Sequence, residues 1–355
     1  MLMSFEKFMQ NGVSEWMSGV GPESDIVISS RVRLARNIKN HPFPLLLTQS
    51  EAESVIIEMR KALENKQIKE ISNFELILLD DLTDLQKRVL VEKHLISFNL
   101  ANESKKGAVA LSENESISIM INEEDHLRIQ CLYPGFQIFD AWKMANKLDD
   151  TFEQQIEYAF DEKRGYLTSC PTNVGTGIRA SVMLHLPALV LTGHINKIIS
   201  AITQVGLTVR GIYGEGSEAL GNLFQVSNQI TLGQTEEDIL ENLHGVVKQI
   251  IEQERYARKK LVTEKRTQIE DRVNRALGIL AYAKIIDSKE ATQRLSDLRL
   301  GIDLEMIEGV SSNILNELMV ITQPGFLQQY AGEALGADER DIRRATTIRE
   351  RLAYK

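Results

Sequence analysis

Hydrophobic and polar residues alternate in strand fashion in the middle of the chain, and two further apolar segments of strand length follow. The polar turn 113–115 separates the first two segments, and the glycine-rich loop 214–221 separates the last two. Because such short connections join neighbouring antiparallel strands, we expect a meander. The predicted strands are 108–112, 116–121, 127–132, 205–213 and 223–230.

Helices are predicted on both sides of these strands. Before and between them, the pattern favours helices over 50–64, 85–94 and 139–160. After Thr235, apolar residues recur at helical spacing, namely Ile239, Leu243, Val246, Val247 and Ile250. An antiparallel meander covered by helices indicates an α+β fold and not a doubly wound α/β fold.

The last hundred residues are predicted to be all-helical. Residues 188–323 contain no proline, and the dense alternating charges of 252–272 indicate an exposed helix. Further helices are expected over 279–286, 291–300, 304–308, 311–318 and 338–352. We expect Asp303 and Asp338 to cap two of them and 323–325 to form a turn. The chain therefore divides into domains at 1–256 and 257–355.

Composition narrows the classes of protein that are compatible with this pattern. The chain has 355 residues, 43% hydrophobic and 26% charged, and no apolar run approaches the roughly 20 residues of a membrane helix. Two cysteines, Cys131 and Cys170, and the absence of a secretory start favour thiols in a reducing cytoplasm. A net charge of −9 argues against direct nucleic-acid binding.

Two segments hold the residues most suited to chemistry. Residues 121–128 read Ile-Asn-Glu-Glu-Asp-His-Leu-Arg, and residues 170–181 read Cys-Pro-Thr-Asn-Val-Gly-Thr-Gly-Ile-Arg-Ala-Ser. The two glycines followed by Arg179 predict a phosphate-binding turn at a helix start. The turn is not a Walker A sequence, and the protein-kinase signatures His-Arg-Asp and Asp-Phe-Gly are absent from the chain.

Five arginines near predicted turns could clamp phosphates, because a guanidinium is always charged and donates two parallel hydrogen bonds. Each arginine taken alone is more simply explained as a surface ion-pair partner. Two of them stand at strand spacing i, i+2, which places both side chains on one face. The candidates are Arg31, Arg33, Arg128, Arg179 and Arg210.

Three acids and a thiol are candidates for the reacting centre. Glu123 and Glu124 are adjacent, so in a strand they would face opposite sides and only one would reach the site. Cys170 among arginines could be a thiolate or a small buried apolar residue. Glu215, flanked by glycines, suits either a closing lid or a hairpin tip.

The motifs taken together resemble the guanidino (phosphagen) kinases. The matching segments are Ser-Ser-Arg-Val-Arg from Ser29, the two segments above, and Val-Arg-Gly-Ile-Tyr-Gly-Glu from Val209. They occur in the family's order over 24–255. The resemblance implies an antiparallel-sheet, glutamine-synthetase-like catalytic domain, with ATP and Mg²⁺ as cofactors and no dedicated metal site in the protein.

Within the family, the chain is most similar to the bacterial members that phosphorylate arginine side chains of proteins. Residues 1–28 are too few for the helical domain that precedes this motif in creatine and arginine kinases, which suggests an open acceptor site. The helical C-terminal segment is also absent from those kinases. It contains Arg-Asp-Ile-Arg-Arg-Ala, and the resemblance implies an allosteric phosphoarginine pocket formed by Arg340, Asp341, Arg344 and Ala345.

The resemblance also assigns roles at the active site. Glu124 is the implied catalytic carboxylate, with Glu123 beside it, Glu215 closing over the acceptor and Cys170 contacting the guanidinium. The implied nucleotide-binding residues are Ser29, Ser30, Arg31, Val32, Arg33, His94, Arg128, Arg179, Ala180, Ser181, Val182, Met183, Arg210, Gly211, Ile212, Tyr213 and Gly214.

The same resemblance implies partners and leaves alternatives open. The expected partners are protein substrates with exposed arginines, a Clp chaperone–protease that degrades marked proteins under stress, an activator protein and further copies of the chain. A kinase for free arginine or another small guanidine is the alternative enzyme. A phosphoarginine-binding adaptor with a decayed site is the third possibility, and the intact acids, thiol and arginines argue against it.

Overall fold

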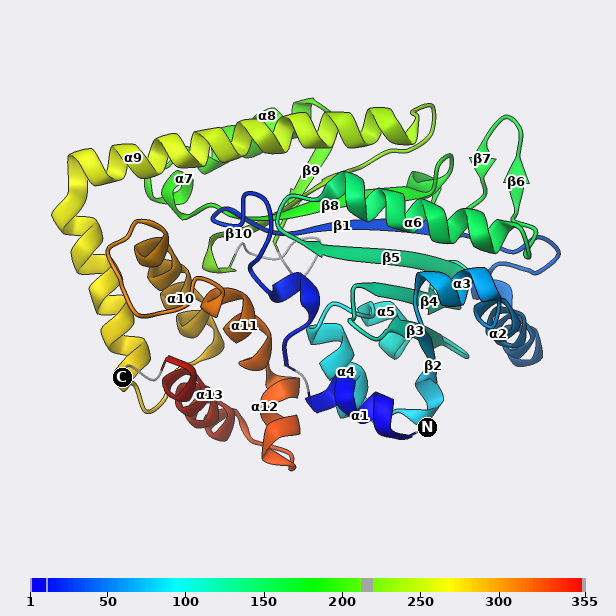
Figure 1. Cartoon of the computed structure of the whole chain (residues 1–355), viewed down its shortest axis with the longest axis horizontal. Coiled ribbons are helices and arrows are strands. Elements are labelled where there is room, and N and C mark those ends of the chain that lie inside the picture. Colours follow the sequence, from blue (N-terminus) through cyan, green and yellow to red (C-terminus); the bar gives the residue numbers. More distant parts are fainter. Residues whose placement is uncertain (1, 11, 212–219, 353–355) are drawn as a thin grey trace.

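The computed structural model describes residues 2–10, 12–211 and 220–352. Within them, eight strands form one antiparallel sheet in the order β2-β3-β4-β5-β1-β8-β10-β9 (Figure 1). The bounds are β1 Val27–Arg36, β2 Phe74–Leu78, β3 Ala108–Ser112, β4 Ile117–Ile121, β5 Leu127–Pro134, β8 Ile178–His185, β9 Leu207–Arg210 and β10 Leu223–Asn228. The predicted antiparallel α+β fold is confirmed.

Strand β1 lies at the centre of the sheet and determines which side chains face the site. It pairs with β5 on one side and with β8 on the other. Its apolar residues Val32 and Leu34 are buried, and Arg36 on the same face pairs with Asp149 of α6 (Ile138–Glu153). Arg31 and Arg33 therefore point to the opposite face, away from α6.

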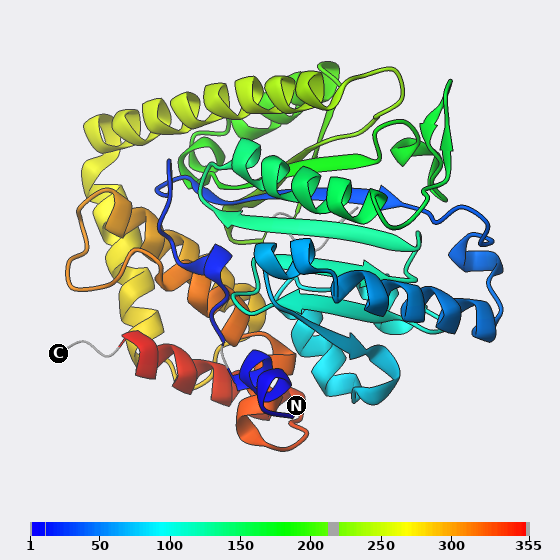
Figure 2. The same cartoon turned by 45° about the vertical axis from the view of Figure 1, so that its right-hand side comes forward.

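Helices pack around the sheet, and α2 (Gln49–Leu63) and α4 (Asp84–Glu92) are among those that begin with a capping box. In α2 and α4, Thr48 with Glu51 and Thr83 with Gln86 satisfy the first free amides. Figure 2 shows α2 and α6 in front of the strands. The remaining helices of the first 210 residues are α1 Leu2–Gln10, α3 Lys66–Ile71, α5 Phe98–Asn102, α7 Pro187–Leu191 and α8 Ile195–Gln204, with α2 at Gln49–Leu63 and α4 at Asp84–Glu92.

Several predicted boundaries in this part are wrong. Helix α6 ends at Glu153, because the chain then turns into a hairpin of β6 (Phe160–Asp161) and β7 (Gly165–Tyr166). Strand β9 starts at Leu207, two residues later than predicted, and β10 ends at Asn228, two residues earlier. Non-local pairing, which local pattern does not report, sets these ends.

A 47-residue helix, α9 (Glu236–Tyr282), joins the sheet to the C-terminal helices. It bends at Lys265, whose backbone leaves the helical region (φ −138°, ψ 30°). The predicted exposed helix 252–272 lies inside it, although Glu254 and Arg258 are buried against the rest of the chain. The expected domain boundary at 256/257 falls within this continuous helix, and the division itself stays a prediction.

The C-terminal segment is helical as expected, but its ends differ. Asp303 is the last residue of α10 and not a cap, and 304–308 is not helical. Pro324 opens α12 instead of a turn, because proline fits the first helical turn, where its missing N–H is not needed. The helices are α10 Ser288–Asp303, α11 Ile314–Ile321, α12 Pro324–Ala331 and α13 Ala337–Leu352. Asp338 lies within α13 and does not precede it.

Candidate active site

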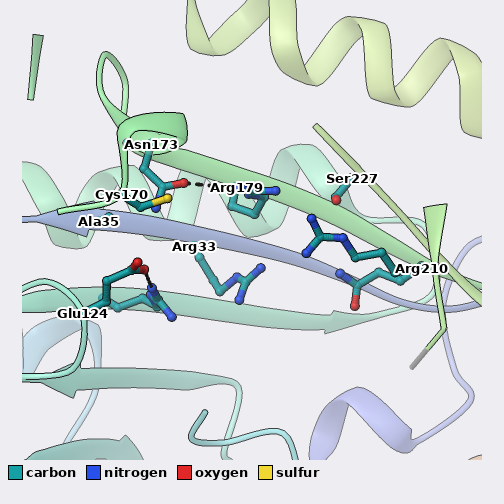
Figure 3. A pocket seen from close by; sticks show the side chains of 11 residues that line it. Arg33, Ala35, Glu124, Cys170, Asn173, Arg179, Arg210 and Ser227 are labelled. Atoms are coloured by element: carbon teal, nitrogen blue, oxygen red, sulfur yellow. Dashed lines mark hydrogen bonds and ion pairs between the residues drawn. The ribbon is translucent and has the colours of Figure 1, made fainter. Parts of the chain in front are cut away.

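The five predicted arginines lie on one face of the sheet. Residues directly opposite each other in an antiparallel pair share a face, as do residues two apart in one strand. Arg33 is opposite Arg179, Ala35 is opposite Arg128, and Arg210 is opposite Gln225. Four strands thus direct their guanidinium groups to the same side, and Figure 3 shows Arg33, Arg179 and Arg210 along one cavity.

These arginines repel one another, and the repulsion adds to the effect of burial on the pKa of two of them. Burial, followed by the charges of Arg128 and Arg179, lowers the pKa of Arg31 to about 10. Burial, followed by the charges of Arg31, Arg128 and Arg179, lowers the pKa of Arg33 well below its usual value. The Nε atom of Arg33 is buried without a hydrogen-bond partner. A bound polyanion would supply the missing charge and acceptors, so the array favours phosphates.

The acids Glu123 and Glu124 lie in the loop between β4 and β5, which the predicted strands 116–121 and 127–132 also leave between them. Arg128 pairs with both of them: its Nη1 lies 2.6 Å from Glu123 Oε2 and its Nη2 lies 3.0 Å from Glu124 Oε2. The side chain of Glu123 is 2% exposed, whereas that of Glu124 is 39% exposed and lines the cavity. Burial, opposed by Arg128 and supported by Asp125 and Glu123, raises the pKa of Glu124.

The segment around Cys170 forms the opposite wall. Its Sγ lies 3.1 Å from Thr172 Oγ1, and Asn173 accepts a hydrogen bond from Arg179 at 3.4 Å. Cys170 is partly exposed, whereas burial of Cys131 raises the pKa of that thiol. Cys170 is therefore the thiol that a substrate can reach.

The predicted helix start after the two glycines is wrong, because β8 begins at Ile178. Gly177 has a φ of +68°, and a Cβ there would lie 2.5 Å from the Arg36 guanidinium and 2.6 Å from the Ala35 carbonyl oxygen. The glycine is thus required by backbone packing against β1, and not by a phosphate at a helix N-terminus.

One cavity, with an empty volume of about 600 Å³, is lined by four of the arginines and by Glu124 and Cys170. Figure 3 shows Glu124 and Cys170 at one end and Arg210 at the other. Gln225 and Ser227 of β10 and Asn173 also line it, although none of them was among the predicted site residues. A signal for two of them is present in the sequence: Gln225 and Ser227 alternate with the buried Phe224 and Val226 in a predicted strand.

A second, smaller hollow of about 260 Å³ adjoins the first and shares Gln225 with it. Arg31 donates to Gln225 Oε1 at 3.0 Å, and Trp16 meets His94 edge to face with ring centres 5.5 Å apart. Burial, followed by the charge of Arg31, lowers the pKa of His94 to about 4, so its ring is neutral at pH 7. The lining residues are Trp16, Ser29, Arg31, His94, Leu132, Ser181, Met183 and Gln225.

Other predicted nucleotide residues lie elsewhere. Ser30, Val32, Ala180 and Val182 are buried and alternate with the residues named above, so their side chains belong to the opposite face of the sheet. Gly211 directly follows β9 and is buried. Ile212, Tyr213, Gly214 and the predicted catalytic Glu215 lie outside the described residues.

The predicted phosphoarginine residues lie together on α13. Arg344 is buried and donates to the carbonyl oxygens of Thr322 at 3.0 Å and Ile286 at 3.1 Å, and it pairs with Asp341. Arg340 donates to the Leu335 carbonyl at 2.7 Å, and Ala345 is buried. This charged cluster connects α13 to the segment before α10 and to the residue that follows α11.

His126, next to the acids, gives the first testable prediction. Its Nδ1 accepts from the Ile38 amide at 3.0 Å, so its Nε2, 3.0 Å from the Pro42 carbonyl, carries the proton. Burial, followed by His41, lowers its pKa to about 4, below the usual value of roughly 6.5. The folded state therefore binds fewer protons than the unfolded state between these values. Its contribution to stability is complete above pH 6.5 and is lost as the pH falls towards 4.

The variant His126→Gln cannot titrate in this range. We expect its free energy of unfolding to fall less steeply between pH 6.5 and 4 than that of the wild type, by on the order of 3 kcal/mol. Urea denaturation at several pH values measures this difference. His194→Gln, at an exposed position, is the control. Parallel curves for wild type and His126→Gln would contradict the prediction.

Comparison with known proteins agrees with this geometry. Residues 54–257 match the family model "ATP:guanido phosphotransferase, C-terminal catalytic domain", and residues 266–355 match the "Protein-arginine kinase McsB C-terminal domain". Relatives named protein-arginine kinase occur in Halalkalibacterium halodurans, at 64% identity, and in Brevibacillus brevis, at 62% identity. Each alignment spans 350 residues, 99% of this chain and 98% of the relative.

Solved structures show the same fold. A lombricine kinase aligns at 25% identity with a TM-score of 0.57, over 67% of this chain and 68% of its own. A substrate-free duplicated taurocyamine kinase from Schistosoma mansoni aligns at 19% identity with a TM-score of 0.59, over 94% of this chain and 53% of its own.

The sheet, the arginine array and these matches define a class of enzyme that moves a phosphoryl group between ATP and a guanidino group. The chain belongs to the ATP:guanido phosphotransferase family. The predicted family and kinase activity are confirmed. No helix in the described part of the chain is long and apolar enough to cross a membrane.

Proposed function

We propose that this enzyme transfers the γ-phosphoryl group of ATP to arginine side chains of proteins. The observation that carries the proposal is the single cavity in which a row of arginines meets Glu124 and Cys170. The arginines suit the phosphates, and the acid–thiol end suits a guanidinium. Full-length relatives at above 60% identity are named for this activity.

The acceptor must be deprotonated during the reaction. A guanidinium has a pKa of about 12.5–13.8 and stays protonated at neutral pH. Glu124, exposed to the cavity and aligned by Arg128, is suited to bond the planar fork and to take its proton. Glu123 supports Arg128 from the buried side. Glu215, from the segment outside the described residues, is proposed to close over the acceptor.

The arginine array is proposed to hold ATP. The phosphates would lie against Arg33, Arg128, Arg179 and Arg210, with the base near Trp16 and His94 in the adjoining hollow. Among the described residues, no three His, Cys, Asp or Glu side chains gather as a metal site. We therefore propose that Mg²⁺ arrives with the nucleotide, held by phosphate oxygens and water, and neutralises the phosphate charge there.

Incubation with ATP separates the possible acceptors. An unfolded basic protein and free arginine are supplied in parallel, and products are read by mass spectrometry at neutral or basic pH, because the N–P bond is acid-labile. Phosphorylated arginine in the protein supports the proposal. Phosphorylation of free arginine alone would identify a small-guanidine kinase, and neither product would favour a binding adaptor.

The cellular roles are proposed from the same resemblance. The marked proteins would be substrates of a Clp chaperone–protease in the cytoplasm, and an activator protein and self-association would regulate the kinase during stress.

A second prediction concerns α13 as a phosphoarginine pocket. In such a pocket, Asp341 would pair with the guanidino end and the arginines with the phosphate. Binding there would stimulate the kinase if the pocket prefers the active state. We expect Asp341→Ala to keep the basal rate and to lose the stimulation by added phosphoarginine, measured as initial rates. Asp338→Ala, exposed on the same helix, is the control. Equal stimulation of Asp341→Ala and wild type would leave a structural ion pair as the role of Asp341.

A further inference from the structure

A hydrogen-bonded connection joins the two walls of the acceptor end. Ser169 precedes Cys170 in the chain, and its Oγ donates to the main-chain carbonyl of Glu124 at 2.7 Å. The amide of Ser169 donates to Asp125 Oδ1, also at 2.7 Å. One residue therefore holds two consecutive positions of the acid loop, immediately beside the thiol.

Asn37, directly after β1, reinforces this connection. Its Nδ2 donates to Asp125 Oδ1 at 2.7 Å and to the Leu167 carbonyl at 3.0 Å, while its Oδ1 accepts from the His126 amide at 2.9 Å. Asn37 thus bonds the acid loop and the segment before Cys170 at once. Asn37 and Asp125 are almost completely buried, so water cannot replace these bonds.

We propose that Ser169 is a positioning residue for the phosphoryl acceptor, and that it sets the separation between the Glu124 carboxylate and the Cys170 thiol. The inference rests on the acceptor roles proposed above for Glu124 and Cys170. Ser169 does not line the cavity, so it acts through its two neighbours. A displacement of about 1 Å in a catalytic group can cost up to 10²-fold in rate.

The serine hydroxyl is the adjustable part of this connection. Ser169→Ala removes the bond to the Glu124 carbonyl but keeps the amide bond to Asp125 and both bonds of Asn37. The loops therefore stay attached, while the main chain of Glu124 loses one of its restraints. Handling of ATP should not change, because the Arg179 guanidinium is held by Asn228, Thr172 and Asn173, which the substitution leaves in place.

The kinetic test uses the full chain with ATP and an arginine-containing peptide. For Ser169→Ala we expect kcat/KM for the peptide to fall about 10- to 100-fold, with the KM for ATP within twofold of wild type. Ser169→Thr, which keeps the hydroxyl, should recover most of the loss. Ser200→Ala removes a similar bond to a main-chain carbonyl on α8 and should have no effect. Unchanged peptide kinetics in Ser169→Ala, or an equal loss for ATP, would overturn the inference.

A second readout does not depend on turnover. Cys131 is buried, so alkylation by iodoacetamide reports on Cys170. Peptide should slow this alkylation in wild type, and Ser169→Ala should need at least tenfold more peptide for the same protection. If peptide fails to protect the wild-type thiol, the proposed acceptor role of Cys170 is wrong. If it protects wild type and Ser169→Ala equally, only the role of Ser169 is wrong.

Discussion

Glu124→Gln is expected to lower kcat for arginine phosphorylation by about 10²–10⁴-fold, which is the usual range for loss of a general base. The amide has the same shape, and its oxygen can still accept from Arg128, which lies 3.0 Å from the carboxylate. It cannot take a proton from the guanidinium, however. ATP binding should change little, because the carboxylate lies at the acceptor end of the cavity. Initial rates and nucleotide titration measure the two effects separately.

The control for this variant is Glu113→Gln, which changes a carboxylate that is 74% exposed and pairs with Lys7. It should be as active as the wild type. A Glu124→Gln enzyme within a few-fold of wild type would show that another group, or solvent, accepts the proton. A parallel loss of ATP affinity would instead place Glu124 among the nucleotide contacts.

Arg179→Ala is expected to lower kcat/KM for ATP by about 10²–10³-fold, the cost of removing one preorganised donor from a developing charge. Arg179 stands between the walls of the cavity: it lies opposite Arg33 and donates to the Asn228 carbonyl at 3.1 Å. Its planar group is thereby held at the cavity, where the phosphates are proposed to bind. Arg179→Lys should not restore the loss, because an ammonium group cannot replace a bidentate fork.

Arg179→Ala should lower the use of ATP without lowering the stability of the ligand-free protein. Arg33 and Arg179 are like charges in directly opposed positions, an arrangement that destabilises a sheet. We therefore expect Arg179→Ala to unfold near the wild-type temperature without ligand, but to gain much less stability from ATP. Arg164→Ala, at an exposed position of the β6–β7 turn, is the control. Full activity of Arg179→Lys would contradict the phosphate role.

The sequence by itself determined the parts of this protein that depend on local pattern. Alternation predicted β3, β4, β5 and β10 within one or two residues, but it did not predict the central strands β1 and β8. The i, i+2 spacing of Arg31 and Arg33 placed both on one face. The acid, thiol and arginine motifs were sufficient to indicate the guanidino kinase family. These inferences hold because strand periodicity and motif chemistry are properties of short segments.

Only the tertiary structure decided which residues of neighbouring strands lie opposite each other. The register of β8 on β1 places Arg179 against Arg33, and that of β10 on β9 brings Gln225 to Arg210. In the fold, Gly177 directly precedes strand β8 and not a helix. Ser169 also joins the loop of Glu123 and Glu124 to the segment of Cys170 by a hydrogen bond. Such contacts join residues far apart in the chain, and a shift of one residue in register would turn every side chain to the other face. Local sequence preferences do not determine the register, because the register depends on the packing of the whole sheet.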